Sequence, residues 1–200
     1  MEAVREHQGG YQTHSRLVGG EMTYDVILAD PPWNFDVWSK KGNARTASSH
    51  YQTMTIEDIC SLNIAELAAD NCALFIWTVW PRIFDAEKVI NAWGFKYRTL
   101  GYEWVKMNSS GLGFHIGLGY YTRANSEPCL LAVKGSMKVA TRGERNLLMT
   151  PIREHSRKPD EQYSKIERLY PNMRYLELFA RHRHPGWDVF GNEVEGSISL

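Results

Sequence analysis

The fold of this chain is decided by one stretch, Tyr24-Asp25-Val26-Ile27-Leu28-Ala29-Asp30-Pro31-Pro32-Trp33. Apart from Asp25, residues 24–29 are apolar and partly β-branched, which is typical of a short buried strand. Two prolines follow almost at once, and they end the strand because proline has no N–H to donate to a sheet. Asp30 is therefore predicted to lie at the carboxyl end of a buried strand, where open α/β sheets bind their ligands.

The segments after this strand alternate between helical and extended patterns. Helices are expected where apolar residues recur at helical spacing between caps, prolines and glycines, over 55–69, 81–94 and 159–170. Further strands are expected over 73–79, 97–105, 129–133 and 174–179. This order predicts an α/β fold with a mostly parallel sheet and helices on both faces. We expect a single catalytic domain over residues 21–200, preceded by a flexible arm over residues 1–20.

The composition indicates a globular protein without a membrane span. The chain has 200 residues, of which 43% are hydrophobic, so it can form a sizeable core. Its longest apolar run, 72–80, is about half of the roughly 20 residues that cross a bilayer. Residues 1–20 lack an apolar signal core, and the 3 cysteines are widely spaced, which fits reduced thiols. A cytoplasmic protein is expected.

A formal net charge of zero conceals an uneven distribution of charge. The chain has 23 basic and 23 acidic residues, but sixteen of the basic and only eight of the acidic ones lie between Lys96 and Arg183. The rest of the chain carries the opposite surplus. A solvated basic face and a nucleic-acid-binding face both fit this pattern.

The tetrapeptide Asp30-Pro31-Pro32-Trp33 contains the groups needed to methylate an exocyclic aromatic amine. The lone pair of such an amine is delocalised into the ring, so it is a poor nucleophile until acceptors hold its two N–H bonds. The Asp30 carboxylate and the Pro31 carbonyl are two such acceptors, Pro32 makes the turn rigid, and the Trp33 ring can stack on the base. The alternative is a proline turn that ends a strand, with Trp33 as core filling.

Further motifs resemble those of a known family, in the family's order. They are Ala29 to Trp33, Tyr51-x-Thr53-Met54, Trp104-Val105-Lys106, Glu127 before residues 130–135, Lys158 to Glu161, Glu177 to Arg181, and Gly186-Trp187 before Gly191-Asn192-Glu193. From about Tyr24 to about Glu195 the chain resembles the permuted, β-type N6-adenine methyltransferases named after the seventy-kilodalton catalytic subunit of eukaryotic messenger-RNA adenosine methyltransferase. The resemblance implies a Rossmann-like methyltransferase that uses S-adenosylmethionine, from a bacterium or a phage.

The same resemblance implies a role for individual residues. Asp30 and Pro31 would hold the amine, with Asp30 close to the methyl donor, and Trp33 would stack on the base. The target-adenine pocket would be lined by Tyr51 and Glu127, with Lys106 nearby. Besides Asp30, the residues implied to bind the donor are Lys158, Leu178, Phe179, Arg181, Asn192 and Glu193. Among them Lys158 would contact the methionine carboxylate.

Each of these assignments has a structural alternative. Lys158 and Arg181 also fit solvated surface cations, and Glu193 fits a surface acid. Leu178 and Phe179 belong to a core strand in both interpretations. No metal site is expected, because His182-x-His184 is accompanied by no cysteine or carboxylate cluster with ligand spacing. A surface or phosphate-contacting role is predicted for these histidines.

The expected reaction is methylation of the N6 amine of adenine in DNA. RNA is the alternative substrate, and DNA is preferred because the chain has no zinc finger or RNA-recognition motif. A catalytically silent nucleic-acid-binding subunit and a cytosine or protein-amide methyltransferase are further alternatives. The target base has to leave its stack, and the loops 34–53 and 107–125 are predicted to close over it. A homodimer or a partner protein is expected to share recognition.

Overall fold

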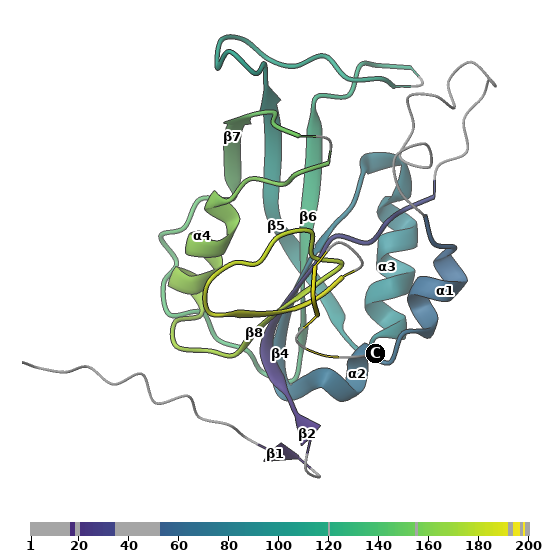
Figure 1. Cartoon of the computed structure of the whole chain (residues 1–200), viewed down its shortest axis with the longest axis vertical. Coiled ribbons are helices and arrows are strands. Elements are labelled where there is room, and N and C mark those ends of the chain that lie inside the picture. Colours follow the sequence, from purple (N-terminus) through teal and green to yellow (C-terminus); the bar gives the residue numbers. More distant parts are fainter. Residues whose placement is uncertain are drawn as a thin grey trace, which may run out of the picture.

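The computed structural model describes residues 17–18, 21–34, 53–119, 121–154, 156–191, 194–196 and 198. Their main feature is a seven-stranded sheet covered by helices on both faces (Figure 1). The strands of this sheet are β3 (Tyr24–Ala29), β4 (Ala68–Trp77), β5 (Lys96–Met107), β6 (Ser126–Lys134), β7 (Leu147–Pro151), β8 (Tyr175–Leu178) and β9 (Trp187–Phe190). The helices are α1 (Ile56–Ser61), α2 (Ile64–Leu67), α3 (Ile83–Ala92) and α4 (Glu161–Leu169), with a short 3₁₀ turn η3 (Trp80–Arg82) before α3. The predicted Rossmann-like α/β fold is confirmed.

The strands run mostly parallel, in the order β7-β5-β6-β4-β3-β8-β9. Strand β3 is parallel to β4 and β8, β8 is parallel to β9, and β5 is parallel to β7. Strand β6 is antiparallel to both of its neighbours, β4 and β5. Because of this double reversal, β5 points the same way as β4. The ends of β3, β4, β5 and β8, together with the start of β6, therefore lie along one edge of the sheet, which we call the carboxyl edge.

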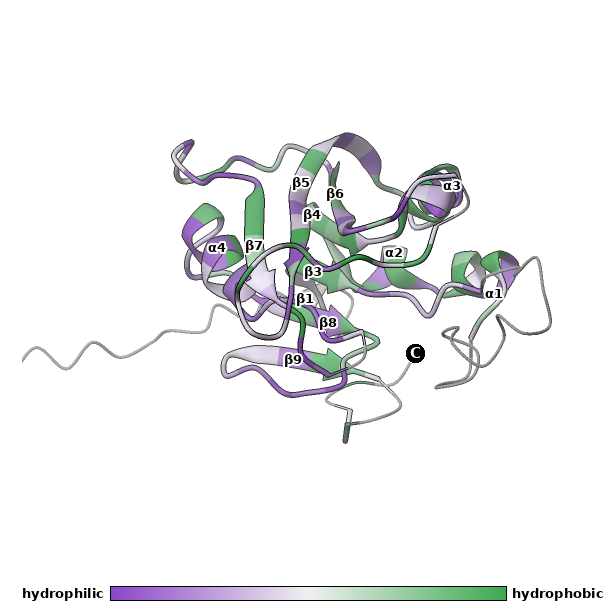
Figure 2. Ribbon diagram, turned by 90° about the horizontal axis from the view of Figure 1, so that it is seen from above, coloured by the Kyte–Doolittle hydropathy of each residue, from purple (hydrophilic) through white to green (hydrophobic). Residues whose placement is uncertain are grey.

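Side chains alternate between the two faces of the sheet, and each face has its own core. Along β3, Ile27 and Ala29 face helices α1 to α3, whereas Val26 and Leu28 face α4. Burial on both faces explains why residues 26–29 are all apolar, since parallel strands covered on both sides read as continuous hydrophobic runs. In the view from above, α3 and α1 lie to one side of the sheet and α4 to the other (Figure 2).

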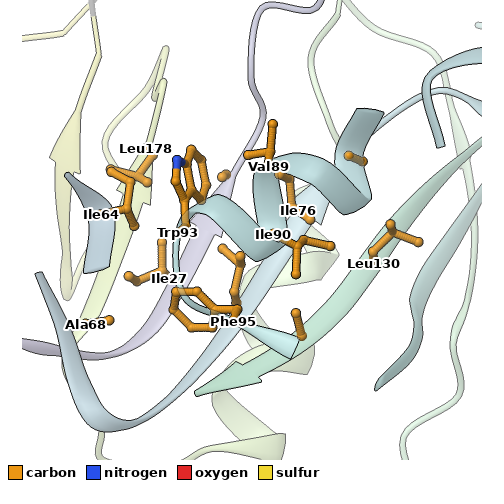
Figure 3. Packing of buried hydrophobic residues seen from close by; sticks show 14 of the residues in the cluster. Ile27, Ile64, Ala68, Ile76, Val89, Ile90, Trp93, Phe95, Leu130 and Leu178 are labelled. Carbon is orange, nitrogen blue, oxygen red and sulfur yellow. The ribbon is translucent and has the colours of Figure 1, made fainter. Parts of the chain in front are cut away.

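On the first face, α3 packs against the centre of the sheet. Figure 3 shows Val89 and Ile90 of α3, and Trp93 directly after the helix, among side chains of the strands, including Ile27 and Ile76. The indole N–H of Trp93 donates to the carbonyl of Ile59 over 2.9 Å, which links α3 to α1. Each fully buried aliphatic side chain of this kind contributes about 1.5 to 3 kcal/mol relative to exposure.

On the second face, aromatic rings join α4 to the sheet. The rings of Phe75 and Tyr102 are stacked with centroids 5.6 Å apart, and Tyr170 meets Phe75 edge-on at 6.1 Å. Tyr163 and Ile166 of α4 belong to the same buried cluster. We call the two sides of the sheet the α3 face and the α4 face.

The predicted helix over 55–69 is wrong in one respect, because it consists of two short helices. Thr55 caps α1 as the sequence pattern indicates, since its hydroxyl accepts the backbone N–H of Asp58 over 3.0 Å. Leu62 then adopts an extended conformation, α2 restarts at Ile64, and Ala68 already opens β4. The helical spacing of apolar residues continues through this break because both helices bury their apolar residues in the same core, on the same face of the sheet.

The end of α3 is as predicted. Gly94 follows the helix with a φ of 80°, a left-handed conformation that glycine adopts without the steric cost of a Cβ. The N–H of Phe95 then donates to the carbonyl of Ile90 over 3.0 Å. This capping closes the helix and turns the chain into β5.

Strands β7 and β9 at the two edges of the sheet are absent from the sequence-based prediction. In β7 only Leu148 is buried, and β9 has four residues, so neither carries a long hydrophobic pattern. Strands β1 (Leu17–Val18) and β2 (Glu21–Met22) form a separate antiparallel pair within the expected arm and its border. None of the helices among the described residues is long and apolar enough to span a bilayer.

Candidate active site

Charged side chains from several strand ends meet on the α4 face of the carboxyl edge. Asp30 directly follows β3 and continues the alternation of Val26 and Leu28, which face α4. By the same alternation, Glu127 of β6 lies on the side of Cys129, and Lys106 of β5 on the side of Trp104. A single face thus gathers residues that lie far apart in the sequence.

Lys158, which precedes α4, joins these groups into one network of alternating charge. Its ammonium nitrogen lies 2.7 Å from Oδ2 of Asp30 and 3.5 Å from Oε2 of Glu127. The ammonium of Lys106 contacts the other oxygen of Glu127. All four side chains are largely shielded, with between 11% and 27% of their surface exposed. Two of the predicted site residues from the donor group and two from the adenine group are therefore neighbours.

The two lysines keep the Glu127 carboxylate charged. Burial raises the pKa of this carboxyl, but the charges of Lys158 and then Lys106 lower it further than burial raises it. The net result is a pKa below the usual value for glutamate. Losing either lysine would leave a poorly compensated charge in a shielded place, which is costly.

A cavity of about 180 Å³ opens beside this network. Its walls include Asp30, Trp77, Lys158, Tyr163, Glu177 and Phe179. The methionine end of S-adenosylmethionine carries one ammonium and one carboxylate, which match the charges of Asp30 and Lys158. Aromatic walls suit the remaining apolar surface of a nucleoside. The residues of this cavity therefore fit the donor that the sequence implies.

Glu177 was given no role from the sequence, although it lies in this cavity wall. The hydroxyl of Tyr163 donates to its two carboxylate oxygens over 3.1 and 2.9 Å. Burial raises the pKa of Glu177 to about 7, the hydrogen bond from Tyr163 opposes this, and the charge of Asp30 adds to it. The available sequence signal is a single carboxylate within the otherwise apolar run of β8.

Phe179 holds an unusual backbone conformation where β8 ends. Its φ is 62°, a conformation that costs a residue with a side chain on the order of 1 kcal/mol and that recurs at functional sites. Gly191 lies so close to Ala180, the residue after Phe179, that a Cβ on Gly191 would be 2.1 Å from the carbonyl oxygen of Ala180. Only glycine fits this crossing. The loop after β8, which carries Arg181 into the cavity wall, is thereby held against the end of β9.

Trp33 is placed differently from the base-stacking expectation. Its ring is only 4% exposed and belongs to the core on the α3 face. Its indole N–H donates to the carbonyl of Trp77 over 2.9 Å, and the carbonyl of Pro32 accepts the N–H of Met54 over 3.0 Å. The structure thus favours the alternative interpretation, in which Trp33 fills the core and anchors the Asp-Pro-Pro turn.

The other residues that the sequence singled out lie in different places. Leu178 is fully buried on the α3 face, as expected for a core strand. Tyr51, Asn192 and Glu193 lie outside the described residues, as does most of the loop 34–53. The ring of His184 stacks on Tyr163 with centroids 4.0 Å apart. In the described part of the chain, no three His, Cys, Asp or Glu side chains form a group that could hold a metal.

Comparison with known proteins gives consistent matches over most of the chain. A family model described as MT-A70 matches residues 24–193. The N(6)-adenosine-methyltransferase MT-A70-like of Arabidopsis thaliana is 32% identical over 177 residues, which are 87% of this chain and 24% of that protein. The N(6)-adenosine-methyltransferase catalytic subunit METTL3 of Homo sapiens is 32% identical over 86% of this chain and 28% of its own length.

A bacterial relative is matched along most of its length. The type II methyltransferase M.MunI of Mycoplasma sp is 30% identical over 188 residues, which are 86% of this chain and 78% of that protein. The chain therefore spans about a quarter of the plant and human relatives and more than three quarters of the Mycoplasma one.

Proposed function

The chain belongs to the MT-A70 family, and on this premise we propose that it transfers the methyl group of S-adenosylmethionine to the N6 amine of adenine in DNA. The observation that carries the proposal is the meeting of Asp30, Lys158 and Glu127 beside the cavity at the carboxyl edge. The enzyme needs no nucleophilic side chain and forms no covalent intermediate, because the amine attacks the methyl group directly.

Asp30 and Pro31 hold the amine in this proposal. The Asp30 carboxylate accepts one N–H and the Pro31 carbonyl the other, which localises the lone pair on nitrogen. The Pro31 carbonyl already accepts the N–H of Trp33 over 2.8 Å, but a carbonyl oxygen has a second lone pair for the substrate. In this proposal the Asp30 carboxylate also accepts the proton that the methylated amine releases. When bound, S-adenosylmethionine supplies an electrophilic methyl group on a sulfonium.

The other residues of the network position the two substrates. Lys158 binds the carboxylate of the donor, and Phe179 and Arg181 flank its ribose. Glu127, held by Lys106, lines the pocket for the target adenine together with Tyr51. Asn192 and Glu193 complete the donor site around the ribose and adenine.

DNA is the preferred substrate in this proposal. The match to the type II methyltransferase M.MunI extends over 78% of that protein, whereas the named N(6)-adenosine-methyltransferases are matched over about a quarter of theirs. The likeness to a relative named as a type II methyltransferase supports DNA as the substrate, in a bacterial or phage protein. Adenosine in RNA is the second candidate, and the names of the plant and human relatives support it. A second copy or a partner protein would help to select the sequence.

The test is transfer of labelled methyl from S-adenosylmethionine to DNA and RNA oligomers, followed by nucleoside analysis. We expect N6-methyladenine in DNA; label confined to RNA would select the second candidate, and label in cytosine, in protein or nowhere would refute the proposal. Asp30→Ala should abolish transfer while calorimetry still detects donor binding. Asp70→Ala, which changes an exposed aspartate of β4, is the matched control and should keep full activity.

A further inference from the structure

The connection between β5 and β6 exposes an unusual amount of apolar surface next to the site. We call residues 108–125 the β5–β6 arm, which is described except for residue 120. Figure 1 shows it as the teal segment above the end of β5 and the start of β6. Its exposed apolar side chains, with the fraction exposed, are Leu112 (77%), Phe114 (53%), Ile116 (73%), Leu118 (60%) and Tyr121 (102%). Exposed apolar groups gathered in this way mark an interaction site.

The arm is held in this shape by its own backbone. The N–H of His115 donates to the carbonyl of Lys106 over 2.9 Å, and the N–H of Gly117 donates to the carbonyl of Ala124 over 2.8 Å. Phe114 pairs with Met107 in an antiparallel bridge. The apolar side chains are therefore presented outward by a segment whose backbone is already held in place.

The β5–β6 arm follows closely after Lys106, a residue of the candidate active site. Lys106, whose carbonyl holds His115, is the residue whose ammonium contacts Glu127. Because Phe114 pairs with Met107, it lies one residue along β5 from Lys106. Phe114 thus lies at the same edge of the sheet as Asp30, with its side chain on the side of Met107, opposite to the face that carries the Lys106 side chain.

The absence of acidic residues from the arm favours a negatively charged partner. Residues 104–126 contain no aspartate or glutamate, whereas the arm carries Arg123 and His115. A polyanion meets no repulsion along this segment. Nucleic acids offer base faces to apolar rings and phosphates to cations, and proteins that open a base stack use apolar side chains in this way. A nucleic acid fits both properties of the arm.

We propose that the β5–β6 arm binds the nucleic-acid substrate, with Phe114 stacking on bases that become exposed when the target adenine leaves the helix and Arg123 contacting the backbone. This inference rests on the proposed function for the identity of its substrate. It also assigns to Phe114 the contact with bases that the buried ring of Trp33 does not offer.

The experiment compares wild type, Phe114→Ala and Tyr97→Ala. Tyr97 is a matched control because it is 47% exposed and lies at the start of β5, at the opposite edge of the sheet. Binding to a fluorescently labelled DNA duplex is measured by anisotropy, methyl transfer by label incorporation, and mass in solution by sedimentation. Loss of one stacking contact predicts about ten-fold weaker DNA binding for Phe114→Ala, with unchanged mass, while Tyr97→Ala stays within about two-fold of wild type.

Three results would overturn the inference. The first is equal DNA binding by wild type and Phe114→Ala, the second is an equal loss in Tyr97→Ala, and the third is a Phe114→Ala protein that loses a partner copy but keeps its affinity for DNA. The third result would make the arm a protein interface. If wild type binds DNA but methylates no nucleic acid, the proposed function fails, and the binding comparison still decides the role of the arm.

Discussion

Replacing Glu177 by glutamine should change how the stability of the fold depends on pH. The pKa of this buried carboxyl is about 7, compared with 4.5 for an ordinary glutamate. The folded state therefore binds the proton more tightly than the unfolded state does. Glu177 contributes stability that is fully present below about pH 4.5 and is lost as the pH rises through about 7. Glutamine keeps an acceptor for the Tyr163 hydroxyl but does not titrate.

The size of the effect follows from the difference between the two pKa values. One pKa unit corresponds to about 1.4 kcal/mol, so the contribution of Glu177 is on the order of 3 kcal/mol. Glu127, whose pKa is lowered, contributes to the pH dependence in the opposite direction. The informative quantity is therefore the difference in unfolding free energy between wild type and Glu177→Gln at each pH.

Urea unfolding between about pH 5 and about pH 8 measures this difference. We expect the unfolding free energy of Glu177→Gln to rise relative to that of wild type by up to about 3 kcal/mol as the pH rises across this interval. Glu87→Gln, which changes an exposed glutamate of α3, should run parallel to wild type. A difference between Glu177→Gln and wild type that stays constant with pH would refute the argument, because it would mean that Glu177 titrates alike in the folded and unfolded chains.

Two further predictions concern the core and the substrate. Trp33→Ala should lower the unfolding free energy by about 3 to 5 kcal/mol. Trp33→Phe should lower it by about 1 kcal/mol, because the hydrogen bond to Trp77 is lost. Urea unfolding checks both values, and unchanged stability with lost methyl transfer would restore the base-stacking role. DNA binding should weaken steeply with salt although the pI is about 7.1, because the basic residues are concentrated between Lys96 and Arg183. Affinity that is independent of salt in a titration would contradict this placement of charge.

The central elements of the fold were predictable from the sequence, and the edge elements were not. Strand β3 and the end of α3 follow from signals within a few residues, namely a continuous apolar run before two prolines and Gly94 after a helical pattern. The break at Leu62 and the edge strand β7 lack such signals. A strand at an edge buries few side chains, so its existence depends on the neighbour that it pairs with.

The candidate site divides in the same way. The sequence motifs indicated groups that the fold brings together, since Asp30, Lys106, Glu127 and Lys158 all meet in one network. They did not indicate that Lys158 pairs with both carboxylates, because Asp30 and Lys158 are 128 positions apart. The role of Trp33 was left open between stacking and core filling, and its 4% exposure favours the core.

The sequence by itself determined the order of the central elements, the strand that ends just before Asp30 and the types of residue that the proposed amine methylation needs. These depend on local properties: the period of apolar residues, the conformational limits of proline and glycine, and the chemistry of single side chains. Only the tertiary structure decided which charges neutralise one another, that burial raises the pKa of Glu177, and that the β5–β6 arm stands exposed beside the site. Burial and charge pairing depend on distances between residues far apart in the chain, and the folded sheet sets those distances.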